Sequence, residues 1–340
     1  MTDTQLQLGF DADNLPVPGP EKGRLGVSKK RTAAPEIPQA LTAEAMAELL
    51  SKHPDFKVLR RLQPMLHFPE ASEGERVRVL VLDTETTGLD HSRDKIIELA
   101  ILQVDVDRVT GLPVGAVSVY DGLEDPGVPI SPEIEAITGI SNAMVLGHRL
   151  DEGRIASLLE DADLVIAHNA AFDRPFCEAR IPAFANLPWG CSFADIDWKK
   201  EGQGSAKLEY LAMEKGWFYE AHRAEVDCHA LLAVLGQPLP ASAMSGLAKI
   251  LQASQGPSYR LQATNAPFEA KDLLKARGYR WNAEQRVWHH RLSSEAELMA
   301  ECEWLKSAVY AGRAARVQLE KLTAAVKYSS RSGELSMIQI

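Results

Sequence analysis

The sequence lacks several features that mark other classes of protein. No apolar run approaches the roughly 20 residues that a membrane-spanning helix needs, and the first ten residues, MTDTQLQLGF, lack the apolar core of a secretory signal. The four cysteines contain no CxxC pair, which argues against a zinc site and against a disulfide framework. We therefore expect a cytoplasmic protein with reduced thiols and no contact with a membrane.

Charge is unevenly distributed along the 340 residues. The net charge of −10 argues weakly against a general nucleic-acid coat protein, although clustered acidic metal ligands would push a nuclease in the same direction. From Pro257 onward there are thirteen Lys or Arg against nine Asp or Glu, a local +4. The C-terminal part is therefore the better electrostatic partner for phosphates.

The chain divides into a tail, a lead-in, a main domain and a C-terminal module. Residues 1–40 contain five prolines and a basic stretch, and we expect a disordered tail. Residues 41–75 form a helical lead-in that begins at the N-cap Thr42 and continues after Pro54 into FKVLRRL. The main domain is expected to cover 76–240. The apolar content of the chain, 45%, is enough for a sizeable core.

The main domain is predicted to be a mixed α/β sheet. The runs 77–82, 95–106 and 115–122 are three successive strands, which suggests an antiparallel meander. The segment SPEIEAITG then carries Ser131 as N-cap, Pro132 in the first turn and Gly139 at the stop of a helix. DLVIAHN, 163–169, is a short buried strand between helical stretches, which favours a parallel addition to the sheet.

Residues 257–312 are expected to form a small α+β module, followed by a helical or flexible tail at 313–340. The module's pattern is strand, helix ending at Gly278, hairpin and closing helix. Its aromatic residues alternate with arginines, a mixture suited to stacking on bases and contacting phosphates. The alternative is that the tryptophans form the core of the module.

Three short motifs carry the chemistry. Asp83 and Glu85 in LDTETTGLD lie two apart at a strand end, so that their side chains emerge on one face and can share a metal ion. Asp173 in HNAAFD follows a buried strand and starts a helix, the usual place for a site residue in an open α/β sheet. In HRAEVD, Asp227 can complete the ligands, while His222 on the preceding loop can reach an attacking water. Asp-x-Glu alone is frequent by chance, so the inference depends on the three motifs together.

In this order and spacing the motifs resemble those of DEDDh exonucleases, the family of bacterial polymerase III proofreading epsilon subunits. The resemblance covers about residues 76–235, and EAITGISNAMV is similar to the family's connecting helix and loop. It implies a ribonuclease-H-like fold with a five-stranded mixed sheet flanked by helices, and a bacterial, cytoplasmic enzyme. It also implies two divalent ions, Mg²⁺ or Mn²⁺, held by Asp83, Glu85, Asp173 and Asp227, with His222 as general base.

The resemblance implies further contacts with the substrate. Thr86 and Leu89 match positions that hold the terminal nucleotide, and His168, Asn169 and Phe172 lie beside the same site. Leu89 and Phe172 could equally belong to the core.

The expected function is 3′-to-5′ removal of nucleotides from DNA in replication proofreading or repair, with single-stranded or frayed 3′ ends as substrate. An RNA-trimming enzyme with the same site is the first alternative, and a non-catalytic scaffold bound to the sliding clamp is the second.

The N-terminal segment QLQLGF resembles the QxxLxF peptide by which bacterial replication and repair proteins bind the sliding clamp. Gln5, Leu8 and Phe10 would be the anchors. A mobile tail with apolar anchors suits a peptide that orders on contact and raises the local enzyme concentration at DNA. An incidental apolar cluster is the alternative. A replicative polymerase is a further expected partner, although the polymerase-binding tail of epsilon subunits is not recognisable in this chain.

Overall fold

The computed structural model describes residues 41–70 and 74–340, and these divide into two compact units whose boundary follows His53. In the first unit, α1 (Ala43–Ser51) begins as predicted, because the Thr42 side chain accepts a hydrogen bond from the Ala45 N–H. The expected disordered tail and the candidate clamp-binding residues Gln5, Leu8 and Phe10 lie outside the described residues. None of the helices in the described part of the chain is long and apolar enough to cross a membrane.

The second unit begins without the helix that was predicted for FKVLRRL. Instead, β1 (Arg60–Arg61) pairs in parallel with β8 (Trp217–Phe218), and the backbone N–H of Leu62 bonds to the carbonyl of Phe218. The helical prediction was wrong because Pro54 interrupts the chain and the segment finds its hydrogen-bond partners more than 150 residues away.

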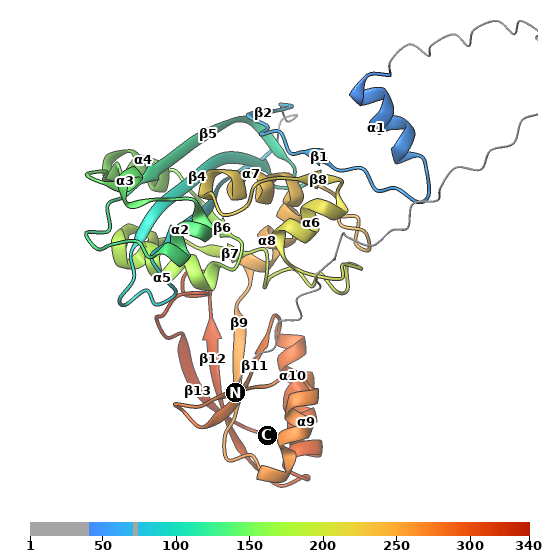
Figure 1. The fold of residues 1–340 in the computed structure, drawn as a ribbon. Helices are drawn as coiled ribbons and strands as arrows, with labels where there is room; N and C mark the ends of the chain where they lie inside the picture. Colours follow the sequence, from blue (N-terminus) through green and yellow to red (C-terminus); the bar gives the residue numbers. More distant parts are fainter. Residues whose placement is uncertain (1–40, 71–73) are drawn as a thin grey trace, which may run out of the picture. The chain divides into compact units, whose positions relative to one another are not determined.

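A six-stranded mixed sheet forms the centre of this unit (Figure 1). The predicted meander is confirmed, since β4 pairs antiparallel with both β3 and β5, and the predicted parallel addition is confirmed by β6 beside β3. A two-residue strand, β2, extends the expected five strands at one edge. In spatial order the strands are β2 (His67–Phe68), β5 (Pro113–Leu123), β4 (Ile96–Asp107), β3 (Arg76–Thr86), β6 (Leu164–Ala167) and β7 (Trp189–Cys191).

Helices cover both faces of this sheet. Because side chains alternate along β3, Val79 and Val81 enter one apolar cluster, which includes residues of α6, α7 and α8, while Leu80 and Leu82 enter another with α4 and α5. α2 begins after the Ser131 cap and ends at Gly139, which has a left-handed backbone conformation, as the sequence predicted. The helices are α2 (Pro132–Thr138), α3 (Asn142–Val145), α4 (Glu152–Glu160), α5 (Ala170–Arg180), α6 (Leu208–Glu214), α7 (Ala224–Leu235) and α8 (Gly246–Gln255), with a 3₁₀ turn at Pro182–Asn186.

The C-terminal module is a five-stranded antiparallel sheet with helices α9 and α10 (Figure 1). Its elements are β9 (Ser258–Ala263), a 3₁₀ turn at Phe268–Ala270, α9 (Lys271–Ala276), β10 (Arg280–Asn282), β11 (Val287–Leu292), α10 (Glu295–Trp304), a π-helical turn at Leu305–Val309, β12 (Arg316–Leu322) and β13 (Glu334–Gln339). The predicted tail at 313–340 is therefore not helical but supplies two strands. The alternation of apolar residues in RVQLEKL suits β12, which pairs with β9 inside the sheet.

The turn between β12 and β13 is bound to the part of the unit that contains the central sheet through Arg174. This arginine of α5 is fully buried and donates hydrogen bonds to the carbonyls of Ala324, Ala325 and Lys327. It also forms an ion pair with Glu178 at 2.6 Å. The Tyr328 hydroxyl adds a bond of 2.5 Å to Asp195. These contacts connect the C-terminal sheet to the central sheet through α5 and the segment after β7.

Candidate active site

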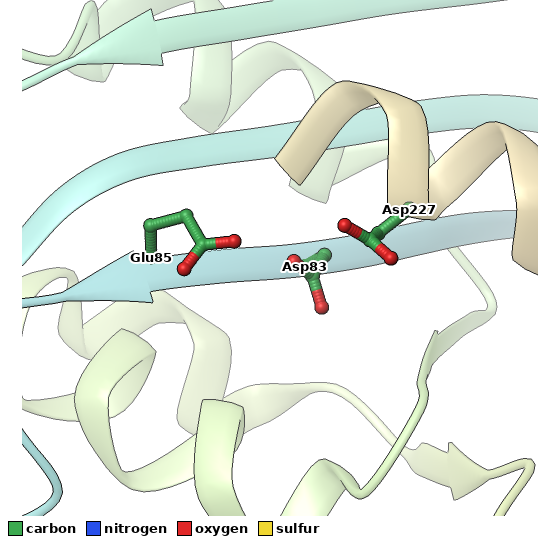
Figure 2. A group of neighbouring side chains, drawn as sticks. All are labelled: Asp83, Glu85 and Asp227. Atoms are coloured by element: carbon green, nitrogen blue, oxygen red, sulfur yellow. The ribbon is translucent and has the colours of Figure 1, made fainter. Parts of the chain in front are cut away.

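Three carboxylates meet where β3 passes the first turn of α7. Asp83 and Glu85 lie two apart on β3, so the alternation of the strand places both on the face that α7 covers. Asp227 comes from α7, and one oxygen of each carboxylate lies within 4.8 Å of the others. Figure 2 shows the three side chains directed toward one another from the strand and the helix. The structure thus brings together three of the four predicted metal ligands.

Asp173 lies beside this group on the first turn of α5. It is 2% exposed, and one of its oxygens accepts a hydrogen bond of 2.8 Å from the Thr84 hydroxyl. Burial is the first cause that raises the pKa of Asp83, and the negative charge of Asp173 is the next. Asp173 is therefore close enough to act on the site electrostatically, while Thr84 orients its carboxylate.

The loop before α7 holds Asp227 through its backbone. The N–H groups of His222 and Arg223 donate to one oxygen of Asp227, at 2.8 and 3.2 Å. His222 has a positive φ of 68°, a conformation that is uncommon for residues other than glycine and is often found at functional sites. Its side chain is exposed.

Burial raises the pKa of every carboxyl group in the site, and repulsion from neighbouring carboxylates raises it further at Asp83 and Glu85. Desolvation is the first cause in each case, and it raises the pKa of Asp173 to about 7 and that of Asp227 to about 6. For Glu85 the pKa rises to about 8, with Asp227, Glu98 and Asp173 as further causes. The pKa of Asp83 is also raised well above its usual value. Carboxylates that repel one another in this way need a positive charge between them to stay ionised at neutral pH.

The donor set fits hard divalent cations. Mg²⁺ and Mn²⁺ prefer carboxylate oxygens, and the cluster of Asp83, Glu85 and Asp227 offers three in reach of one another. No thiol or imidazole belongs to this cluster in the described part of the chain, which suits oxygen-preferring ions better than zinc.

The sequence analysis missed a buried ion pair behind the site. Glu98 on β4 lies opposite Glu85 in the strand register and is completely buried. It accepts bonds of 2.7 and 3.0 Å from the Arg223 guanidinium and one of 2.9 Å from the Ala224 N–H. This pair attaches the start of α7 to the sheet and so positions Asp227. The signal in the sequence was a glutamate inside the apolar run IIELAIL, since a buried charge requires a partner.

Two of the candidate substrate residues lie at the end of β3 and on the loop that follows it. Thr86 is buried and its hydroxyl bonds to the carbonyl of Gly88 at 2.6 Å, so it shapes the loop. Leu89 is 86% exposed, which excludes the alternative that it belongs to the core.

Of the other three, His168 and Asn169 lie between β6 and α5, and Phe172 lies in the first turn of α5. His168 contacts the Ser192 hydroxyl at 2.7 Å, and burial lowers the His168 pKa to about 4, so the ring is neutral. Asn169 is exposed with a positive φ of 67°. Phe172 packs on Phe176 at 5.1 Å against an apolar cluster, as the core alternative expected.

Comparison with known proteins gives the site a family. Residues 80–235 match the sequence profile of the exonuclease family RNase_T. The chain is 36% identical over 114 residues to a PolC-type DNA polymerase III of Caldanaerobacter subterraneus, which covers 33% of this chain and 7% of that protein. It is 28% identical over 171 residues to a DNA polymerase III subunit epsilon of Treponema pallidum, covering 46% of this chain and 74% of that subunit.

Solved structures with a similar backbone include exonuclease X in complex with 5′-overhanging duplex DNA, at 25% identity and a TM-score of 0.34, over 50% of this chain and 99% of that one. This chain spans less than a tenth of the length of the PolC-type relatives. The mixed sheet, its flanking helices and the match over 80–235 agree on one assignment. Residues 80–235, less than half of the chain, are an exonuclease domain of the RNase_T type.

Proposed function

We propose that the protein is a metal-dependent 3′-to-5′ exonuclease that removes nucleotides from DNA. The observation that carries the proposal is the meeting of Asp83, Glu85 and Asp227 within 4.8 Å, with raised pKa values that call for bound cations. Asp173 completes the four acidic positions beside them. Two divalent ions held there would neutralise charge on the phosphate and activate the attacking water.

The residues of the chain have distinct roles in this reaction. His222 accepts a proton from the water whose oxygen attacks the terminal phosphorus. The P–O3′ bond breaks, which releases a nucleoside 5′-monophosphate and leaves a new 3′ hydroxyl that takes its proton from solvent. Arg223 and Glu98 hold the start of α7, so that the Asp227 carboxylate keeps its direction. The exposed Leu89 is suited to pack on the terminal nucleotide.

DNA is proposed as the substrate because relatives of the exonuclease domain are named DNA polymerase III subunits. The test uses 20-nucleotide strands of DNA and RNA that carry a 5′ label, alone or in duplexes with a mismatched 3′ end, with Mg²⁺ or Mn²⁺. We expect a ladder of shortened labelled DNA products, and no ladder with Asp83→Asn. A 3′-terminal phosphorothioate should slow the first cleavage.

Three results would contradict the proposal. Loss of the label as a mononucleotide in the first turnover would indicate attack from the 5′ end. Faster trimming of RNA than of DNA would favour the exoribonuclease alternative. Equal activity of the wild type and Asp83→Asn would refute the proposed ligands.

A role in replication or repair is proposed from the same relatives and from the QLQLGF segment. Clamp binding is tested by co-elution with a bacterial sliding clamp. Deletion of residues 1–10 should abolish co-elution while the cleavage of short oligonucleotides stays at the wild-type rate. Unchanged co-elution would exclude Gln5, Leu8 and Phe10 as anchors.

A further inference from the structure

A cleft of about 630 Å³ separates the C-terminal sheet from the segments that follow β6 and β7. Arg260, Arg280, His289 and Arg291 line it on the side of the C-terminal sheet, and Asn169 and Phe193 line it on the exonuclease side. We call it the basic cleft. We propose that the basic cleft binds the single-stranded part of the substrate by its phosphates and leads the strand to the carboxylates. The assignment of the strand as substrate rests on the proposed function.

The strand register collects these cations on one face of the C-terminal sheet. Arg280 lies opposite His289 on the neighbouring strand, and Arg291 lies opposite Arg260. Since His289 and Arg291 are two apart on β11, all four side chains share one face. The alternate residues of β9, such as Leu261, enter the apolar core that the sheet forms with α9 and α10. One face therefore stabilises the module, and the other presents positive charge.

The positive charge on this face is only partly neutralised. Arg260 pairs with the buried Glu320 at 2.8 Å. Arg280 and Arg291 are both exposed, and neither has an ion-pair partner in residues 41–70 and 74–340. The pKa of His289 is lowered by burial and then by the charges of Arg260, Arg280 and Arg291, which shows that these charges act on one small region. Two guanidinium groups without an ion-pair partner among the described residues, in a protein of net charge −10, are suited to bind phosphate oxygens.

The end of β6 connects the wall of the cleft to the active site along the chain. In the parallel register Leu82 lies opposite Ala167, so Asp83 is level with His168, and Asn169 on the cleft wall is the next residue. Phe193 is 48% exposed and contacts the His168 ring edge-on at 5.8 Å between centroids. An exposed aromatic ring at this point offers a stacking surface for a base, while the arginines hold the backbone.

The two walls of the cleft are connected by the turn after β12. Tyr328 lines the cleft, bonds to Asp195 on the exonuclease side and lies 5.1 Å below the Arg291 guanidinium. Arg174 binds the carbonyls of the same turn from α5. These contacts join the C-terminal sheet to the exonuclease side of the cleft. They fix the spacing of the two walls.

The decisive variant is the full-length protein with Arg280→Glu and Arg291→Glu. Its matched control is Lys306→Glu, which reverses an exposed charge in the π-helical turn at Leu305–Val309, outside the residues that line the cleft. Binding of a fluorescent 20-nucleotide poly-dT strand is measured by anisotropy in EDTA, so that cleavage does not contribute. We expect the double variant to bind at least tenfold more weakly, and the control to bind within twofold of the wild type.

Salt dependence identifies the phosphate contacts. For single strands each phosphate contact contributes roughly 0.7 to the slope of log K against log salt, so loss of two contacts should reduce the slope by about 1.4. The variant Arg280→Lys with Arg291→Lys should retain most of the slope. Equal affinity and slope in the wild type and the double glutamate variant, at equal melting temperature, would overturn the proposal. If the double glutamate variant has a lowered melting temperature, the variant with Arg280→Lys and Arg291→Lys is used instead. Loss of its salt slope would equally overturn the proposal.

Cleavage assays separate this proposal from the proposed function. With Mg²⁺, the ratio of KM for the 20-mer to KM for a dinucleotide should rise in the double glutamate variant, because the dinucleotide does not reach the arginines. If Asp83→Asn and the wild type were equally active, the proposed function would fail, while the anisotropy result would still decide whether the cleft binds a strand. If the KM ratio of the double glutamate variant stays at the wild-type value, the result contradicts the proposal for the basic cleft and leaves the proposed function standing.

Discussion

Replacement of Glu85 by glutamine should stabilise the metal-free protein at alkaline pH. The pKa of Glu85 is raised from 4.5 to about 8, first by burial and then by Asp227, Glu98 and Asp173. A carboxyl group whose pKa is raised on folding contributes its stability below the unfolded pKa, and this contribution is lost as pH rises through the folded pKa. The metal-free wild type should therefore lose stability between about pH 4.5 and pH 8.

The size of this loss follows from the shift. Each pKa unit corresponds to about 1.4 kcal/mol, which gives a ceiling of about 5 kcal/mol for Glu85. Water reaches part of the side chain and screens the repulsion, so we expect a loss of about 2–3 kcal/mol. For a protein of this size that free energy corresponds to a fall in melting temperature of roughly 4–9 °C.

The assay is thermal unfolding in EDTA at intervals from pH 5 to pH 9. Glu85→Gln should lack most of the alkaline loss, whereas Glu284→Gln, at an exposed position in the β10–β11 turn, should follow the wild type. Divalent metal at a hundred times its dissociation constant should restore about 2.7 kcal/mol to the wild type at pH 8 and clearly less to Glu85→Gln. Parallel pH profiles of the wild type and Glu85→Gln would refute the reasoning that repulsion among these carboxylates is relieved by cations.

Three further predictions concern the residues around the site. His222→Asn, which tolerates a positive φ, should lower kcat by about 10²–10⁴ and leave the metal-dependent rise in melting temperature intact; a kcat within threefold of the wild type would exclude His222 as the base. Arg223→Met should cost about 3–5 kcal/mol in urea unfolding, because the buried Glu98 is left without its partner, and a cost under 1 kcal/mol would contradict the pairing. Arg174→Met should cost a similar 3–5 kcal/mol and open the turn after β12 to limited proteolysis, since the Lys327 carbonyl loses its donor and the Ala324 and Ala325 carbonyls each lose one of two; unchanged proteolysis would show that the turn is held by other contacts.

Local patterns predicted the central meander and the helix caps because their causes lie close in sequence. Side-chain alternation places Asp83 and Glu85 on one face whatever the rest of the chain does. Ser131 and Gly139 end α2 through bonds to residues three or four positions away. The end of β3 was predicted at Leu82, but the strand continues to Thr86 because β4 remains paired with it through the site.

Errors occurred where a segment depends on distant partners. FKVLRRL has the composition of a helix, yet its backbone pairs with β8 more than 150 residues away. The strands β12 and β13 were assigned to a helical or flexible tail because the pairing of β12 with β9 and of β13 with β12 cannot be read from local sequence. Of the module's aromatics, Tyr279 is buried in the core whereas Trp281 is 50% exposed, so only part of this set forms the core.

The sequence by itself determined which residues are candidates for the chemistry: four acidic residues and a histidine in three motifs, carried by elements whose patterns are local. Only the tertiary structure decided how these residues are held and what surrounds them. The Glu98–Arg223 pair joins positions 125 residues apart, and Arg174 binds carbonyls about 150 residues away. The cationic face arises because β9, β10 and β11 align Arg260, Arg280 and Arg291 across strands. Such contacts depend on register and burial, which are set when distant segments pack together.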